Sequence, residues 1–295
     1  MRRLYYIFLC ICCAPLALFA QESEADTVKV VDKPQRPAFE SAFLIDNPTD
    51  KLYIPNTLEV VMQHRFGTIG GQENDLLGIW GAANIRIGLN YTIHERLQLG
   101  FGTTKNNRVQ DFNWKVGILR QTRSDKIPVN VSYYGNWAIN ATKWETLQRQ
   151  YPYFQDQHRY SYLHQLIISR RFNQNLSLQV VPSLSHFNLV EEKMRNSLFT
   201  LSVGGRYKVS PQTAITIEHS HPFGHHLDRA DLPMDPEPGF RVRAEFVTSS
   251  HAFQVYLSSS QGIVPQYNFF QYQNQFFKGW DGILLGFTIT RLYNF

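Results

Sequence analysis

Cysteine is nearly absent from this 295-residue chain, because Cys10, Cys12 and Cys13 all lie near the N-terminus. A mature protein without that stretch holds no cysteine, which excludes disulfides, thiolate metal sites and a cysteine nucleophile. Long apolar runs are also missing after residue 20, so no later segment is suited to cross a bilayer as a helix.

The net charge is small, and the common sequence motifs of phosphate-binding loops and of hydrolases are missing too. The formal net charge of +5 falls to +3 when Arg2 and Arg3 are removed, which is too mild to indicate a nucleic-acid partner. No Gly-x-Ser-x-Gly occurs. The glycines of "GTIGG" and "SVGG" are not followed by Gly-Lys-Ser/Thr, so they fit turns or strand bends better than a phosphate loop. No cofactor is predicted.

The first twenty residues, "MRRLYYIFLCICCAPLALFA", have the order of a secretory signal peptide: arginines, an apolar stretch, then small residues. We therefore predict a signal peptide over residues 1–20. A membrane-anchoring helix is disfavoured, because the apolar run is short and polar residues follow at once. A lipid anchor on Cys13 is a minor alternative, since the apolar run continues past it.

Aromatic residues are abundant, at 14% of the chain, although the mean hydropathy is only −0.30. A transmembrane β-barrel fits this combination, because only alternate residues of each strand need to be apolar. The C-terminal "GILLGFTITRLYNF" alternates in this way up to the final Phe295. About twelve such segments occur, at residues 57–67, 83–92, 96–103, 112–121, 129–140, 159–171, 176–189, 196–209, 213–221, 240–248, 251–260 and 282–295.

The connections between these segments alternate between short and long. Outer-membrane barrels have short periplasmic turns and longer extracellular loops, whereas a soluble barrel has no reason to sort its loops by length. The sequence therefore predicts an all-β fold, a transmembrane antiparallel β-barrel of about 12 strands in the outer membrane, with both termini periplasmic.

The last strand is predicted to pair with the first, which lets the chain end without leaving a free edge. Tyr293 and Phe295 would lie in the aromatic girdle at the periplasmic interface, in contact with outer-membrane lipid. The ending also resembles the C-terminal signal that outer-membrane proteins present to their assembly machinery, although Arg291 departs from that pattern.

The residues before the barrel mix charge with proline and serine, so we expect a flexible periplasmic leader over residues 21–50 and a barrel domain over 51–295. One alternative stays open at this point, because the apolar "FESAFLI" could instead pack under the barrel.

Several blocks, among them "VMQHRFG", "ANIRIGLNYTIHERLQLGFG", "SHAFQVYLSSSQGI" and "GWDGILLGFTITR", resemble an uncharacterised outer-membrane β-barrel family of Bacteroidota, the domain-of-unknown-function family 5777. The resemblance covers most of the chain from about residue 40 onward. It implies an outer-membrane barrel in a host with two membranes, and it implies no activity or catalytic residues.

The parity of each strand separates a polar row from an apolar row, and the polar row should face the lumen. In the strand over 159–171 parity is ambiguous, because Leu163 and Ile167 share a face with Gln165. The charged candidates for the lumen are Arg86, Lys115, Arg206, Glu218, Arg241, Arg243 and Glu245.

More of these charges are positive than negative. They fit either a narrow aqueous pathway for small anionic or hydroxyl-rich solutes, or a ladder of paired charges that fills the lumen. Twelve strands do not decide between these, since barrel width lies between that of filled and open barrels. We therefore predict a non-enzymatic, narrow solute channel with a slightly cationic lumen. The alternative is a closed barrel that binds partners through its extracellular loops.

Two further sites were considered and disfavoured. His225, His226 and Asp228 suggest metal ligands, but they lie in a proline-rich loop without the spacing that holds zinc. An outer-membrane lipid hydrolase would need a serine beside a histidine, for which His164 and the serines of "SSSQG" are the candidates.

The aromatic loop near residues 267–277 could be a binding platform or could fold inward and plug the mouth.

Overall fold

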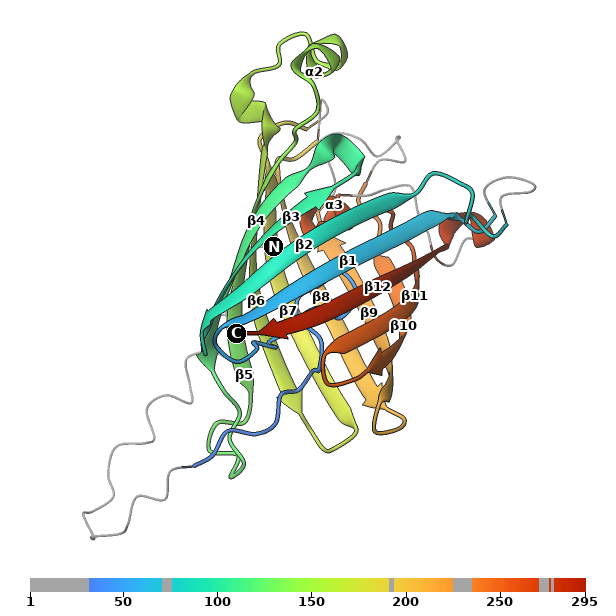
Figure 1. The fold of residues 1–295 in the computed structure, drawn as a ribbon. Helices are drawn as coiled ribbons and strands as arrows, with labels where there is room; N and C mark the ends of the chain where they lie inside the picture. The colour runs from blue at the N-terminus through green and yellow to red at the C-terminus, as the bar shows by residue number, and fades with distance from the viewer. Residues whose placement is uncertain (1–31, 71–75, 191–193, 225–234, 271–275, 277–278) are drawn as a thin grey trace, which may run out of the picture. The chain divides into compact units, whose positions relative to one another are not determined.

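The computed structural model describes residues 32–70, 76–190, 194–224, 235–270, 276 and 279–295. The chain divides into residues 1–32 and 33–295, and every element named below belongs to the second unit. Its twelve strands form one closed antiparallel barrel in which each strand pairs with its sequence neighbours and β1 pairs with β12 (Figure 1). The predicted fold is therefore confirmed. In the part of the chain described, no helix has the length and apolar character needed to span a membrane.

The strands are β1 (Thr57–Thr68), β2 (Asn84–His94), β3 (Leu97–Thr104), β4 (Gln110–Leu119), β5 (Asn130–Ile139), β6 (Tyr160–Arg171), β7 (Leu176–Phe187), β8 (Ser197–Lys208), β9 (Thr213–Phe223), β10 (Gly239–Val247), β11 (His251–Ser258) and β12 (Leu284–Asn294). The helical elements are η1 (Asn106–Arg108), α2 (Trp144–Gln150), η2 (Asp156–Arg159), α3 (Pro265–Phe269) and η4 (Trp280–Gly282).

Residue alternation along the strands separates the two faces of the wall. In β2, Ile87 and Leu89 are exposed on the outside, whereas Arg86 and Asn90 are buried inside. An apolar outer face and a polar interior are the pattern of a barrel that spans a membrane. The mean hydropathy is low because half of the residues of each strand face the polar interior.

The connections follow the predicted sorting except on either side of β4. The β3–β4 connection is only residues 105–109 although it lies at the long-loop end, and the β4–β5 connection is residues 120–129 at the short-turn end. Figure 1 shows α2 standing out from the long-loop end. The chain leaves β12 at the short-turn end, where the Phe295 N–H donates to the Asn56 carbonyl at 3.1 Å.

Pro182 lies in the middle of β7 without ending the strand. On the β6 side the paired residues stop at Gln165 and resume at Ile168 in unchanged register. Proline lacks the N–H that a ladder hydrogen bond needs, which explains the local gap. On the β8 side Pro182 remains opposite Leu201.

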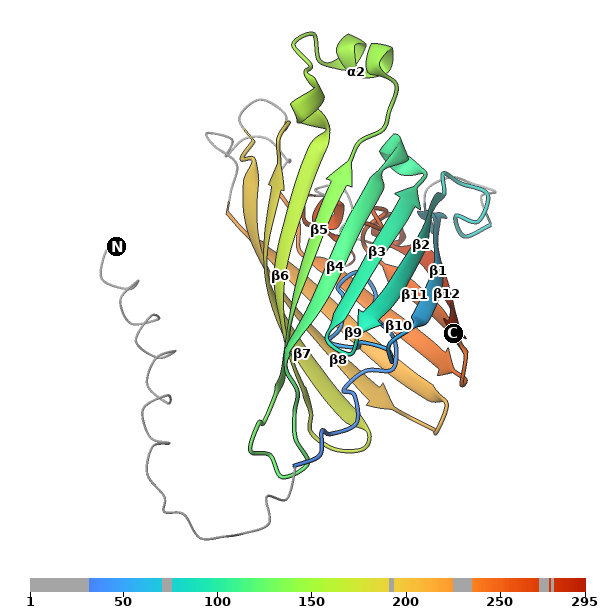
Figure 2. The same cartoon turned by 60° about the vertical axis from the view of Figure 1, so that its left-hand side comes forward.

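The segment from residue 33 to residue 56, which we call the plug segment, enters the barrel from the short-turn end before β1 begins (Figure 2). Its residues 38–49 are mostly buried, and Phe39 and Leu44 form a small apolar cluster with Ala38. The flexible leader predicted up to residue 50 is therefore wrong for residues 38–49. The packing left open for "FESAFLI" does occur, and it is inside the barrel; the predicted signal peptide lies outside the described residues.

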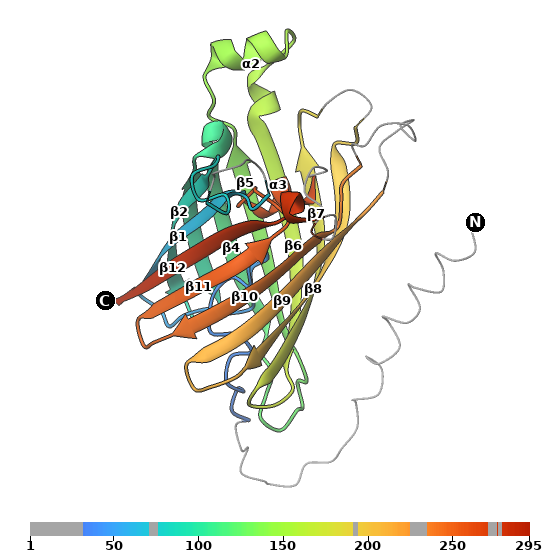
Figure 3. The same ribbon diagram turned by 90° about the vertical axis from the view of Figure 1, so that its right-hand side faces the viewer.

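The β11–β12 connection enters the interior from the opposite, long-loop end (Figure 3). Its helix α3 buries Phe269 against Leu163, Ile167 and Val181. This resolves the ambiguous parity of β6, because Leu163 and Ile167 face inward and pack against the helix. Of the loop over 267–277 that was predicted either to bind or to plug, residues 267–270 fold inward, whereas residues 271–275 and 277 lie outside the described part.

Candidate functional site

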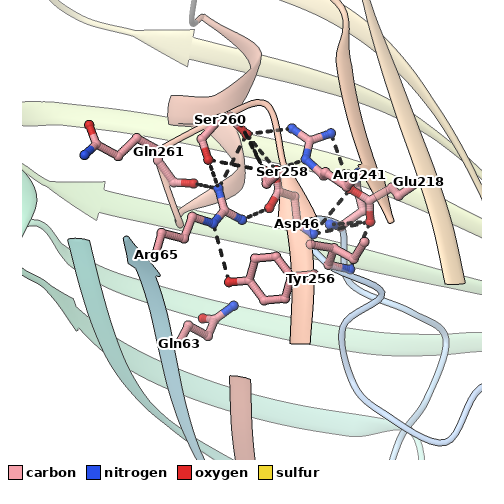
Figure 4. Close-up of polar contacts among 12 residues, drawn as sticks. Asp46, Gln63, Arg65, Glu218, Arg241, Tyr256, Ser258, Ser260 and Gln261 are labelled. Atoms are coloured by element: carbon pink, nitrogen blue, oxygen red, sulfur yellow. Dashed lines mark hydrogen bonds and ion pairs between the residues drawn. The ribbon is translucent and has the colours of Figure 1, made fainter. Parts of the chain in front are cut away.

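Asp46 attaches the plug segment to two strands of the barrel wall. One oxygen of its carboxylate bonds to the Arg65 guanidinium of β1, and the other lies 2.5 Å from Nε of Arg241 of β10 (Figure 4). All three side chains are at most 1% exposed. Such pairs stabilise a buried charge only while both partners remain, because an isolated ion there has lost its hydration. Asp46 therefore pairs with two buried arginines that lie on opposite sides of the seam between β1 and β12, and Arg241 also lies 3.6 Å from Glu218.

Glu218 of β9 makes the reciprocal contact, in which the wall supplies the carboxylate and the plug segment supplies the hydrogen-bond donors. The backbone N–H groups of Ile45, Asp46 and Asn47 all point at its carboxylate, at 3.1–3.3 Å. The Asn47 side-chain amide adds a fourth donor at 3.1 Å. Successive backbone N–H groups that converge in this way form an anion-binding nest. The plug segment thus supplies a carboxylate to the wall and a nest for the carboxylate of the wall.

The β11–β12 connection contacts the same ion pairs from the other side. Arg65 donates to the carbonyl oxygens of Ser260, at 2.7 Å, and Gly262. The Ser260 hydroxyl donates to Asp46 Oδ2 at 3.2 Å and accepts from Arg241 at 3.0 Å. The two inward segments therefore meet at one group of residues, which we call the Asp46 cluster and define as Asp46, Arg65, Glu218, Arg241 and Ser260.

A second contact holds the beginning of the plug segment. The Ser41 hydroxyl bonds to the carboxylate of Glu245 on β10. Glu245 also accepts from Arg206 Nε at 2.8 Å and lies 3.3 Å from Arg243 Nη2. Arg243 in turn donates to the Phe43 carbonyl at 2.9 Å. The charges predicted on β8 and β10 therefore form the paired ladder, and the ladder binds the plug segment.

Lys115 of β4 also points inward and contacts the plug segment. Its ammonium donates to the carbonyl oxygens of Ala42, at 3.3 Å, and Lys51, at 3.1 Å. The ring of Phe43 lies 5.9 Å from the same ammonium, within the range of a cation–π contact.

The remaining predicted cation, Arg86 of β2, pairs within the wall. Its Nε and Nη2 atoms bond to the two oxygens of Asp111 of β4 at 2.8 and 2.7 Å. The guanidinium lies against Gly88 and Gly102, where a Cβ atom would come within 2.6 and 2.3 Å of it. Larger residues at these two positions would displace the arginine from its bidentate contact.

We expect Asp111→Asn to lower the free energy of unfolding by roughly 3 kcal/mol, because it leaves Arg86 buried without its countercharge. The matched control is Asp125→Asn, which removes the partner of Arg170 in a surface pair at 2.9 Å whose side chains are 34% and 53% exposed. An exposed pair is worth only ~0–1 kcal/mol. Urea unfolding in lipid vesicles compares the two, and equal losses would contradict the assignment.

The interior charges carried by the strands do not balance. Among the described strand residues, the buried cations are Arg65, Arg86, Lys115, Arg206, Arg241 and Arg243, whereas the buried carboxylates are Glu59, Asp111, Glu218 and Glu245. Six cations thus face four carboxylates, and Asp46 supplies a fifth from the plug segment. All seven predicted lumen residues lie inside.

The sequence prediction missed Glu59, Arg65, Asp111 and Asp46. Parity alone places Glu59 and Arg65 on the inner row of β1. Asp111 was lost because the predicted strand began at residue 112, two residues after the actual start of β4 at Gln110.

Other predicted residues lie elsewhere. Tyr293 and Phe295 are 38% and 80% exposed at the end of β12. His164 is on the outer face, where it bonds to Tyr133, whereas Ser258 is buried inside, so this histidine and the "SSSQG" serines do not meet. His225, His226 and Asp228 lie outside the described residues. Among the residues that are described, no group of three His, Cys, Asp or Glu side chains could hold a metal ion.

Comparison with known proteins finds one family, described as "Membrane bound beta barrel domain (DUF5777)", which matches residues 39–293. Among solved structures, the COG4313 outer membrane channel from Pseudomonas putida F1 has a TM-score of 0.50 at 13% identity, over 82% of this chain and 97% of that chain. The KdgM porin in complex with disordered oligogalacturonate has a TM-score of 0.47 at 7% identity, over 81% and 99%. No curated protein sequence matches. The likeness to the first structure shows the fold alone.

Proposed function

This chain belongs to the DUF5777 family of membrane-bound β-barrel domains, and from that premise we propose that it is an outer-membrane solute channel held closed by its own plug segment. In this proposal both termini and the short turns face the periplasm, and the long loops face outward. The passing solute is small and anionic or rich in hydroxyl groups.

The observation that carries the proposal is the excess of cations on the inner wall. Six buried cations on the strands face four carboxylates, and Asp46, which lies between Arg65 and Arg241, adds a fifth carboxylate and so reduces the excess from two to one. Displacement of the plug segment would leave an aqueous lumen with a net positive wall. Basic groups at a constriction raise the local concentration of anions and lower their barrier to passage. The plug segment therefore sets both the closed state and the charge of the open one.

Deletion of residues 33–50 should convert a silent barrel into a conducting one. Purified wild-type protein in planar bilayers is expected to show no steady conductance, whereas the deletion variant should give small, discrete steps that favour anions. Arg241→Gln together with Arg243→Gln in the deletion background should weaken the anion preference. Retention of the fold is checked by heat-dependent mobility on electrophoresis.

A folded deletion variant that does not conduct, or that prefers cations, would contradict the channel. The first result would favour the second candidate, a closed barrel that acts as a binding or scaffold protein through its long loops. The observation that supports this candidate is the filling of the interior from both ends, by the plug segment and by α3.

A further inference from the structure

A cavity of about 380 Å³ lies at the long-loop end, between the β11–β12 connection and the ends of the neighbouring strands. Its walls are mainly apolar and include Val109, Phe187, Ile263, Val264, Tyr267 and Phe270. Ligand pockets in proteins are concave, mostly apolar and roughly 300–1,000 Å³ in volume, so this cavity has the size for a small molecule.

The aromatic wall of the cavity is fixed by its own packing. The Phe187 ring meets the rings of Tyr267 and Phe270 edge to face, with centroids 4.9 and 4.7 Å apart. Val264 packs with Val109 and Ala138 in a cluster against which Tyr267 also packs. A wall held by such contacts is already formed before a ligand arrives, which reduces the entropy lost on binding.

The polar groups of the cavity determine the ligand that it suits. No charged side chain is among the residues that line it, and besides Tyr151 and Tyr267 the polar ones are Asn84, Thr104, Asn106 and Asn107. Thr104 is 5% exposed, and its hydroxyl has no hydrogen-bond partner among the described residues. Burial raises the pKa of Tyr267 to about 12, so this residue is neutral at physiological pH. A charged ligand would therefore lose its hydration here without gaining a countercharge.

We infer that this cavity is a binding site for a small, neutral molecule with an apolar, preferably aromatic, body and one hydrogen-bonding group, such as an aromatic alcohol. The apolar body would lie among Phe187, Ile263 and Phe270. The hydroxyl would reach the side of the cavity formed by Thr104 and the asparagines.

The position of the cavity connects it with the Asp46 cluster. Gly262 lines the cavity, and its carbonyl oxygen accepts a hydrogen bond from Arg65, which binds Asp46. A ligand that shifts Gly262 would weaken the hold on Arg65 and thereby the attachment of the plug segment. This second step rests on the proposed function, whereas binding itself does not.

Binding is tested with 4-fluorobenzyl alcohol, followed by fluorine NMR with the protein in lipid nanodiscs. The wild type should broaden the probe signal in a saturable manner. Ile263→Trp and Val109→Phe, which fill the cavity by two independent routes, should each weaken binding at least ~10-fold, a change of about 1.4 kcal/mol. The control is Val255→Trp on β11, a position 48% exposed on the outer wall, which should bind like the wild type.

Equal broadening by the wild type and both filled variants would mean that the probe only partitions into lipid, and the binding site would be refuted. Conductance gives the second readout, since 4-fluorobenzyl alcohol should increase the opening of the wild type. Saturable binding without any change in opening would refute the coupling to the plug segment. A silent deletion variant that still binds the probe would refute the proposed channel and leave the site standing.

Discussion

Asp46→Ala is expected to release the plug segment and to expose the peptide bond after Lys51 to trypsin. The substitution leaves Arg65 buried without its acidic partner and Arg241 with only Glu218, 3.6 Å away, and breaking a buried pair costs ~3–5 kcal/mol. Release of the segment would let water reach both guanidinium groups and recover much of that loss. Since 1.4 kcal/mol is a factor of ten, the released population should rise at least ~100-fold.

Trypsin reports on this release at one site. Lys33 and Arg36 are each followed by proline, which blocks cleavage, so Lys51 is the first position in the plug segment where trypsin can cut. Mass spectrometry of peptides that end at Lys51 gives the rate. Glu40→Ala is the matched control, because it removes a carboxylate from the same segment outside the Asp46 cluster. Cleavage of Asp46→Ala at the wild-type rate would show that other contacts retain the segment.

The second large effect is expected at the end of the chain. Replacement of both Tyr293 and Phe295 by Asp should reduce the amount of folded protein in the outer membrane by at least ~10-fold. Both aromatic side chains are exposed, Tyr293 on β12 and Phe295 directly after it, and aromatic residues anchor a strand at the membrane interface. The substitution also removes the C-terminal aromatic residues that we propose as the signal for the assembly machinery.

Heat-dependent mobility of membrane fractions measures the folded protein. The control is Arg36→Gln with Lys33→Gln, which lowers the net charge by the same two units at exposed positions of the plug segment. Folded protein at the wild-type level in the Tyr293 and Phe295 variant would exclude a role for these residues in assembly. It would not affect the barrel closure, which depends on the backbone pairing of β1 with β12.

Much of the barrel was predictable because its signal is local. A period of two over ten residues is enough to identify a strand and to separate its faces, and all seven predicted charges do lie inside. Parity failed in β6 because an interior covered by α3 is apolar there, so Leu163 and Ile167 resemble residues that face lipid. Assignment by parity assumes that each face of the wall has one environment. The inner face has two, because it is polar in most places and apolar where α3 packs against it.

The plug segment was not predictable in the same way, because its partners are remote in sequence. Asn47 and Glu218 are 171 residues apart, and Ser41 and Glu245 are 204 apart. The segment itself has neither strand alternation nor helical periodicity, and many of its hydrogen bonds go to side chains of the wall. In the sequence Asp46 therefore looks like an ordinary loop aspartate, and only the folded structure shows that Arg65 and Arg241 surround it.

The seam between β1 and β12 has a consequence for the order of folding. It pairs Thr57 with Asn294, which are 237 residues apart, whereas the other pairings join strands that are consecutive in sequence. Contacts of high sequence separation form late, because the entropy of closing a long loop is lost before any contact is gained. Until that seam closes, the sheet has two open edges that can pair with other chains. Arg65 and Arg241 come together around Asp46 only when β1 pairs with β12. Binding of the plug segment inside the barrel would therefore show that this late pairing is complete.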